Sequence, residues 1–179
     1  MRPVVSKHIM IALLISMIMT GAQAQSDTFP VPAYDANRLF YLQRTSNTNT
    51  IVYDLKFENG VLNTDEPVNV SWIRYAERGQ REGLSFIQRK FAYGIRVKPV
   101  AKDKYQLQSV AYKKLVMMLQ KGSEGLYHVY VTINHRTSVL SRIFIKINGG
   151  TFWSPNIEYI ELKGIDPATG KEVIERRKI

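Results

Sequence analysis

The chain has 179 residues, of which 45% are hydrophobic and 22% are charged, an ordinary composition for one globular domain. Its formal net charge of +10 favours acidic molecules as partners. The absence of cysteine excludes disulfides, thiolate metal sites and a cysteine nucleophile.

The N-terminal residues 1–24 have the three parts of a secretory signal peptide. Two basic residues precede an uncharged apolar run at 9–19, and Ala22-Gln23-Ala24 forms an A-x-A cleavage site. The run has roughly half of the length that a transmembrane helix needs, and no later stretch is long enough to span a membrane. We therefore expect export to the periplasm or the medium, with a mature start at Gln25 and a mature charge of 10 − 2 = +8.

Residues 25–37 contain two prolines and no hydrophobic periodicity, which predicts an extended lead-in before a single β domain at 38–179. An apolar run at 39–42 and a polar turn at 46–50 come first. Residues 51–57 then alternate between apolar and polar side chains, a pattern typical of a half-buried strand. Asn59-Gly60 follows directly and favours a tight hairpin, because both residues tolerate positive φ.

A strand is expected at 68–75, and a short helix near 84–93. The helix is indicated by apolar residues that recur at spacings of three and four, at Leu84, Ile87, Phe91 and Ile95. Gly94 would end it. Residues 95–100 would then be extended, and Pro99 places this segment at a sheet edge.

The second half of the chain returns to β patterns. Further strands are expected at 105–109, 126–133, 139–147, 157–162 and 171–179. The strand at 139–147 should turn Val139, Ile143, Ile145 and Ile147 inward. The apolar segment 113–119 fits either a strand or a helix. Turns are expected at 122–125, at Asn148-Gly149-Gly150 and at 166–170.

About nine short strands separated by frequent turns predict a mainly β fold. We expect an antiparallel small barrel of about 8–9 strands, because closure removes exposed edges. A β-sandwich is the alternative. Helices do not alternate regularly with strands, so a doubly wound parallel sheet is not expected.

The sequence contains none of the common nucleophile, phosphate-loop or dinucleotide-binding motifs. His128 and His135 are the two histidines after the signal segment, and neither has a carboxylate at metal-ligand spacing. We therefore expect no metal and no cofactor. The simplest interpretation of His128 is an ordinary strand residue, although a hydrolase site assembled from distant strands could use it.

Arginine and apolar side chains mix most densely at 68–97, which begins with the strand containing Trp72. Arg74, Arg89, Lys90 and Tyr93 could converge there on an anion, since arginine binds carboxylate and phosphate bidentately. The alternative is a solvated basic face whose side-chain stems cover aromatic rings. Trp153, beside two glycines, could stack on a ligand or plug the end of the barrel, and we favour the plug.

Several segments resemble a known family. They are FPVP (29–32), NRLFYLQR (37–44), NTNTIVYDL (47–55), WIRYAE (72–77), IQRKFAYG (87–94), YHVYVTIN (127–134), RIFIKINGGTFW (142–153) and DPATGKEVIERRKI (166–179). They are similar to the domain of unknown function catalogued as number 4833. The resemblance covers nearly all of the mature chain and implies a single domain of exported bacterial proteins. It implies no activity, cofactor or catalytic residue.

These observations favour a non-enzymatic binding module of the cell envelope that takes an anionic or amphipathic ligand. The candidate ligand-binding residues are Trp72, Arg74, Arg89, Lys90, Tyr93, His128 and Trp153. The alternatives are a hydrolase and an interaction protein that docks a partner by its basic face. The partner is unknown, and nucleic acid is not expected.

Overall fold

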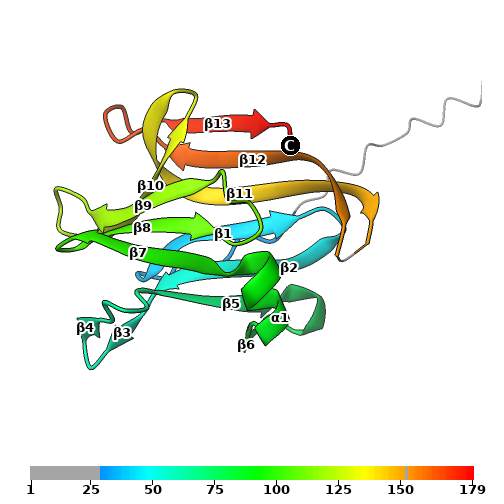
Figure 1. The fold of residues 1–179 in the computed structure, drawn as a ribbon, viewed down its shortest axis with the longest axis horizontal. Helices are drawn as coiled ribbons and strands as arrows, with labels where there is room; N and C mark the ends of the chain where they lie inside the picture. Colours follow the sequence, from blue (N-terminus) through cyan, green and yellow to red (C-terminus); the bar gives the residue numbers. More distant parts are fainter. Residues whose placement is uncertain (1–28, 152) are drawn as a thin grey trace, which may run out of the picture.

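The computed structural model describes residues 29–151 and 153–179. The signal peptide expected at 1–24, the mature start and residues 25–28 of the lead-in lie outside this part of the chain. The described residues form a mainly β fold, a strongly curled sheet with one short helix (Figure 1). No helix in the described ranges is both long and apolar enough to cross a membrane.

The strands in chain order are β1 Arg38–Arg44, β2 Asn47–Leu55, β3 Phe57–Glu58, β4 Val61–Leu62, β5 Val68–Arg74, β6 Gln80–Gly83, β7 Ile95–Ala101, β8 Lys104–Ser109, β9 Val116–Lys121, β10 Tyr127–Ile133, β11 Arg136–Gly150, β12 Pro155–Ile165 and β13 Glu172–Arg177. A 3-10 turn, η1, covers Tyr75–Glu77. The short helix consists of α1 Phe86–Gln88 and a π-helical turn, η2 Arg89–Tyr93.

Strand β11 organises the sheet. One of its edges pairs with β12 along almost its whole length. The other edge pairs first with β10 and then, in parallel, with β1. Two wings therefore leave the same edge of β11, in the orders β1-β2-β5-β6 and β10-β9-β8-β7. Side chains of both wings form one hydrophobic core, so the wings face each other.

The sheet is a half-barrel of mixed direction. The mainly β fold and the short helix at 86–93 are confirmed. The expected antiparallel arrangement needs one correction, because β1 and β11 run parallel. Among the described residues, β6 and β7 end the two wings without pairing to each other, and the helix connects them in the chain. Pro99 lies in β7 at an edge, as predicted.

Strand β2 is buried on both faces, so the prediction of a half-buried strand was wrong. Val52 is fully buried although it alternates with the core residues Ile51 and Tyr53. The outer face of β2 also holds Asp54, which is buried between the guanidinium groups of Arg38 and Arg81. A buried carboxylate needs such partners, because ionic groups without them are costly to remove from water.

The lead-in contributes to covering the outer face of the sheet. Gln43 is a buried residue of β1, and its side-chain amide donates to the carbonyl of Pro30 at 2.7 Å. The ring of Phe29 packs against Phe144 of β11, with centroids 5.2 Å apart. These contacts explain why polar and apolar residues on the outer face are buried together.

Strand β11 also departs from the predicted pattern. A bulge between Leu140 and Arg142 shifts the alternation, so Leu140 is buried in the core and Val139 is not part of it. Ile143 points inward, as expected. Residues 149–150 end the strand instead of forming the turn, and just beyond them the Thr151 amide donates to the Ser154 carbonyl at 3.1 Å. The ambiguous segment 113–119 leads into a strand, β9.

Candidate ligand-binding pocket

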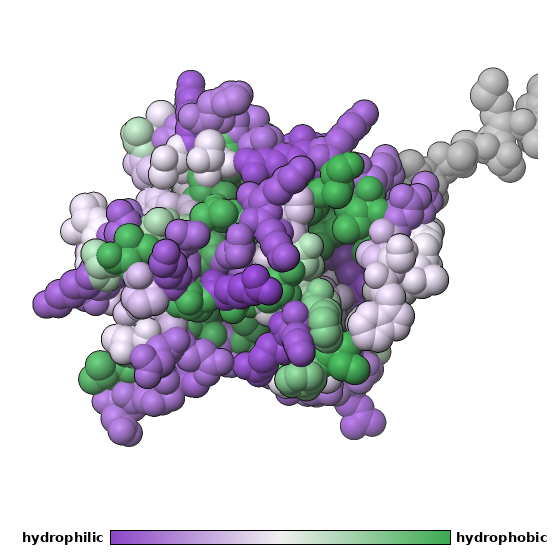
Figure 2. Space-filling model, viewed as in Figure 1, coloured by the Kyte–Doolittle hydropathy of each residue, from purple (hydrophilic) through white to green (hydrophobic). Residues whose placement is uncertain are grey.

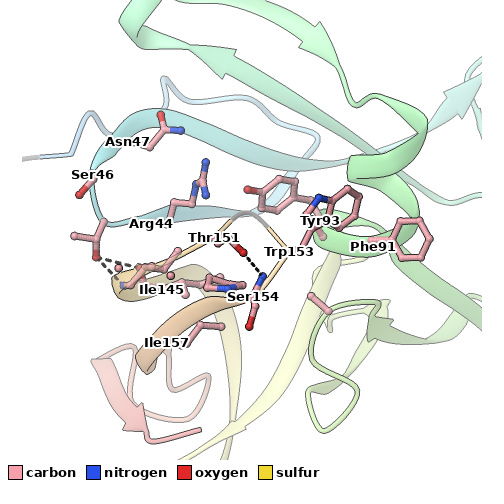
Figure 3. Close-up of a pocket in the computed structure, with 17 residues that line it drawn as sticks. Arg44, Ser46, Asn47, Phe91, Tyr93, Ile145, Thr151, Trp153, Ser154 and Ile157 are labelled. Carbon is pink, nitrogen blue, oxygen red and sulfur yellow. Dashed lines mark hydrogen bonds between the residues drawn. The ribbon is translucent and has the colours of Figure 1, made fainter.

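The structure has a cavity of about 860 Å³, whose lining residues are drawn in Figure 3. Its walls come from the β1–β2 turn, from η2 and from the β11–β12 hairpin. The residues lining it are Arg44, Thr45, Ser46, Asn47, Phe91, Ala92, Tyr93, Ala111, Ile145, Ile147, Gly149, Gly150, Thr151, Trp153, Ser154, Pro155 and Ile157. The volume lies within the range that small-molecule sites occupy, roughly 300–1,000 Å³.

The β1–β2 turn is held in place by β11. The Thr45 amide donates to the carbonyl of Ile145 at 3.0 Å, and the Thr45 hydroxyl accepts from the amide of Ile147 at 3.1 Å. Ser46 has a φ of 61°, which closes the turn tightly. Two segments that are about 100 residues apart in the chain thus form one rigid wall of the cavity.

Arg44 is the charged group of the pocket. It ends β1 opposite Ile145 in the parallel pair, and its side chain enters the cavity (Figure 3). Its Nε is buried and has no hydrogen-bond partner among the described residues. No carboxylate in the described ranges forms an ion pair with it, whereas Arg38, Arg74 and Arg142 all have one.

An unpartnered buried N–H of this kind costs about 1–3 kcal/mol. Guanidinium groups bind carboxylates, sulfonates and phosphates through two parallel N–H donors. The arrangement can therefore hold an anionic group that enters the cavity, and such a group would satisfy the donor that the fold leaves without an acceptor.

Tyr93 forms the aromatic wall beside Arg44. It is only 7% exposed, and its ring meets the ring of Trp72 edge to face at 5.1 Å. Burial raises the pKa of the Tyr93 phenol, and the positive charge of Arg44 offsets part of that rise. The phenol is therefore neutral at physiological pH, so it keeps its proton as a hydrogen-bond donor toward the cavity.

The short helix places Tyr93 and Phe91 on the pocket wall. Ser85 caps it in a capping box with Gln88, and Gln88 also accepts from the indole N–H of Trp72 at 3.3 Å. At the other end the backbone of Gly94 approaches the Arg89 carbonyl so closely that a Cβ would lie 1.9 Å from its oxygen. Only glycine fits this close approach.

Trp153 stands at the mouth of the cavity. It is 68% exposed and meets Phe91 edge to face, with ring centroids 6.3 Å apart. The expectation that Trp153 plugs the barrel was therefore wrong. The hairpin that carries it lies at the surface, and the open half-barrel has no closed end for it to fill.

Of the seven residues proposed from sequence, Tyr93 and Trp153 line the cavity and five do not. Trp72 is buried behind Tyr93. Arg74 lies over the Trp72 ring at 5.0 Å and pairs with Glu82 at 2.8 Å, which matches the alternative of a basic face whose stems cover aromatic rings. Arg89 pairs instead with Glu66 at 3.4 Å, so these arginines do not converge on one point.

His128 lies outside the cavity lining, and its side chain is 30% exposed. Its ring contacts the carboxylate of Glu124 in the preceding loop. A backbone hydrogen bond and the His128 contact hold the pKa of Glu124 below its usual range. The described residues contain no cluster of three or more His, Asp or Glu side chains that could hold a metal ion.

Sequence reasoning missed Arg44. A signal was present, because Arg44 follows Phe40 and Leu42 at strand spacing and so shares the parity of core residues. An arginine that continues the inward face of an apolar strand needs an explanation. The density of arginines at 68–97 drew the interpretation toward residues that pair with nearby carboxylates instead.

The comparisons with known proteins identify the family. The family described as "Domain of unknown function (DUF4833)" matches residues 40–176, a range that includes every residue lining the cavity. No curated protein and no solved structure matches the chain. This chain therefore belongs to the DUF4833 family of domains of unknown function.

Proposed function

We propose that this protein is a binding module whose cavity takes a small amphipathic ligand, with the ligand's acidic group paired to Arg44. The observation that carries the proposal is the buried Nε of Arg44, which has no partner in the described part of the chain and lies at a cavity of about 860 Å³. A buried N–H donor without an acceptor is costly to the fold, so a ligand that supplies the acceptor accounts for its presence.

The remaining lining fits a ligand with an apolar body. Phe91, Ile145 and Ile157 contribute apolar surface, and the phenol of Tyr93 contributes a polar group beside Arg44. Ligand sites typically combine a mostly apolar lining with a few oriented polar groups. The signal peptide expected at 1–24 supports a place of action outside the cytoplasm, which we include in the proposal.

The proposal is tested with two fluorescent dyes of similar shape. 1-Anilinonaphthalene-8-sulfonate carries an anionic group, and N-phenyl-1-naphthylamine lacks it. The wild-type protein should bind the sulfonate dye more tightly. Arg44→Gln should weaken sulfonate binding about tenfold, equivalent to about 1.4 kcal/mol, and change binding of the neutral dye less than about twofold.

Arg74→Gln is the matched control. It removes the same charge from an arginine outside the cavity that already pairs with Glu82. This variant should bind both dyes like the wild type. Equal sulfonate affinity in wild type and Arg44→Gln, or equal losses in the two arginine variants, would contradict the proposed site.

A further inference from the structure

Exposed aromatic side chains lie beside the mouth of the cavity. Phe86 is 73% exposed, Phe91 54% and Trp153 68%, and we refer to these three as the aromatic rim. Phe91 contacts Trp153, and the Lys90 ammonium lies 5.4 Å from the ring centres of both Phe86 and Phe91. Figure 2 shows apolar surface among hydrophilic side chains on this face, over the region where α1 lies in Figure 1. The rim is therefore continuous across η2.

One exposed lysine lies on the rim, and two more follow a cavity-lining residue in the chain. Lys90 contacts the rim directly, and Lys113 and Lys114 are exposed just after Ala111, which lines the cavity. None of the three forms an ion pair with a described residue, whereas Lys56, Lys121 and Lys163 each pair with a carboxylate. The mouth of the pocket thus combines exposed aromatic rings with unneutralised positive charge.

This combination suits a bilayer better than a protein. Tryptophan concentrates at the boundary between membrane and water, where one side is apolar and the other is wet, and phenylalanine of surface-bound segments inserts just below the headgroups. Lysines reach from this boundary to anionic headgroups and strengthen binding by about fivefold each. The cores of protein–protein interfaces, by contrast, are depleted in lysine.

We infer that the aromatic rim docks on the surface of an anionic bilayer and that the pocket takes its amphipathic ligand from that bilayer. The second part rests on the proposed function of the pocket. Docking by the rim places the mouth of the cavity against the lipid. A membrane amphiphile can then enter with its acidic group toward Arg44 and its apolar body along the cavity wall.

The test is sedimentation with large unilamellar vesicles of phosphatidylcholine, with and without about one third of phosphatidylglycerol. The wild-type protein should bind the anionic vesicles more tightly and release them at high salt, because salt screens the lysines. Trp153 emission should shift to the blue on binding, while buried Trp72 supplies a constant background. Phe86→Ser/Lys90→Gln should weaken vesicle binding by about tenfold or more.

Phe57→Ser/Lys98→Gln is the matched control, since it removes one exposed phenylalanine and one lysine that lie outside the rim. This variant should bind anionic vesicles like the wild type. Failure of the wild-type protein to bind anionic vesicles would overturn the inference and leave the rim to a protein partner. Equal losses in the two double variants would overturn it as well.

The experiments distinguish a wrong docking surface from a wrong ligand pocket. Phe86 and Lys90 do not line the cavity, so Phe86→Ser/Lys90→Gln should keep wild-type affinity for the soluble sulfonate dye. Arg44→Gln should lose affinity for that dye and still bind vesicles. Normal dye binding by a protein that ignores every vesicle would sustain the pocket and refute the docking surface.

Discussion

The phenol of Tyr53 donates a hydrogen bond of 2.9 Å to the backbone carbonyl of Tyr93. Tyr53 lies in β2, in the middle of one wing, and its ring stacks on Phe40 at 4.3 Å. Tyr93 ends the π-helical turn that forms a wall of the cavity. One buried hydrogen bond therefore connects the core of the sheet to the segment that shapes the pocket, and burial raises the pKa of the Tyr53 phenol so that it keeps its donor proton.

Replacing Tyr53 by Phe should lower the free energy of unfolding by about 1–2 kcal/mol. The substitution removes the hydroxyl donor and leaves the buried Tyr93 carbonyl without this hydrogen bond. Urea denaturation measures the change. Tyr105→Phe is the control, since Tyr105 is also buried but its hydroxyl has no hydrogen-bond partner in the described ranges. If the two variants lost stability equally, the hydrogen bond would not be what holds the turn.

Arg44→Met should raise the free energy of unfolding by about 1 kcal/mol while it weakens binding of the sulfonate dye about tenfold, as Arg44→Gln does. Methionine fills a similar volume, and the substitution removes a buried N–H that has no partner. Thermal and urea denaturation measure the gain. Arg74→Met, which breaks a pair with Glu82, should show no such gain. A loss of stability in Arg44→Met would mean that the guanidinium is satisfied within the fold.

Gly94→Ala should destabilise the protein by about 3 kcal/mol and disturb the pocket. The new Cβ would meet the carbonyl of Arg89 at 1.9 Å, and backbone cannot move away as a flexible side chain can. Gly83→Ala is the matched control, because a Cβ at Gly83 meets nothing within 4 Å. Calorimetry should find a large fall in Tm for the first variant and little change for the second. Comparable Tm values would show that η2 can shift without cost.

Glu175 should make stability depend on pH in the acid range. Its carboxylate accepts from the guanidinium of Arg177 at 2.9 Å and from the backbone N–H of Asn134 at 2.8 Å. The Arg177 hydrogen bond is the main reason why the pKa of Glu175 lies below its ordinary value of 4.5. A depressed folded-state pKa contributes stability that is fully present above about pH 4.5 and is lost as the pH falls through the folded value.

Glu175→Gln should therefore lower Tm by about 2–4 °C at pH 7, and the difference from wild type should shrink as the pH falls below 4.5. Thermal denaturation between pH 3 and pH 7 measures this. Glu158→Gln removes a carboxylate that forms no ion pair with a described residue, and it should track the wild type throughout. A Glu175→Gln difference that stayed constant with pH would contradict the role of the charge.

Much of the local structure was predictable because it depends on neighbours in the chain. The alternation of side chains located most of the strands, and Asn59-Gly60 forms the expected hairpin with both φ values positive. The helix at 86–93 follows its capping and its terminal glycine. The same spacing does not determine burial, since Ile87 and Phe91 have helical spacing and are exposed.

Only the tertiary structure decided where the site lies. Arg44 enters the cavity because β1 pairs in parallel with β11, about 100 residues later, and because η2 and the β11–β12 hairpin close around it. By itself the sequence determined the mainly β character, the short helix and the absence of disulfides. Those properties follow from residue type and short-range spacing. A pocket depends on which distant segments meet, and the free energy of long-range packing selects those contacts.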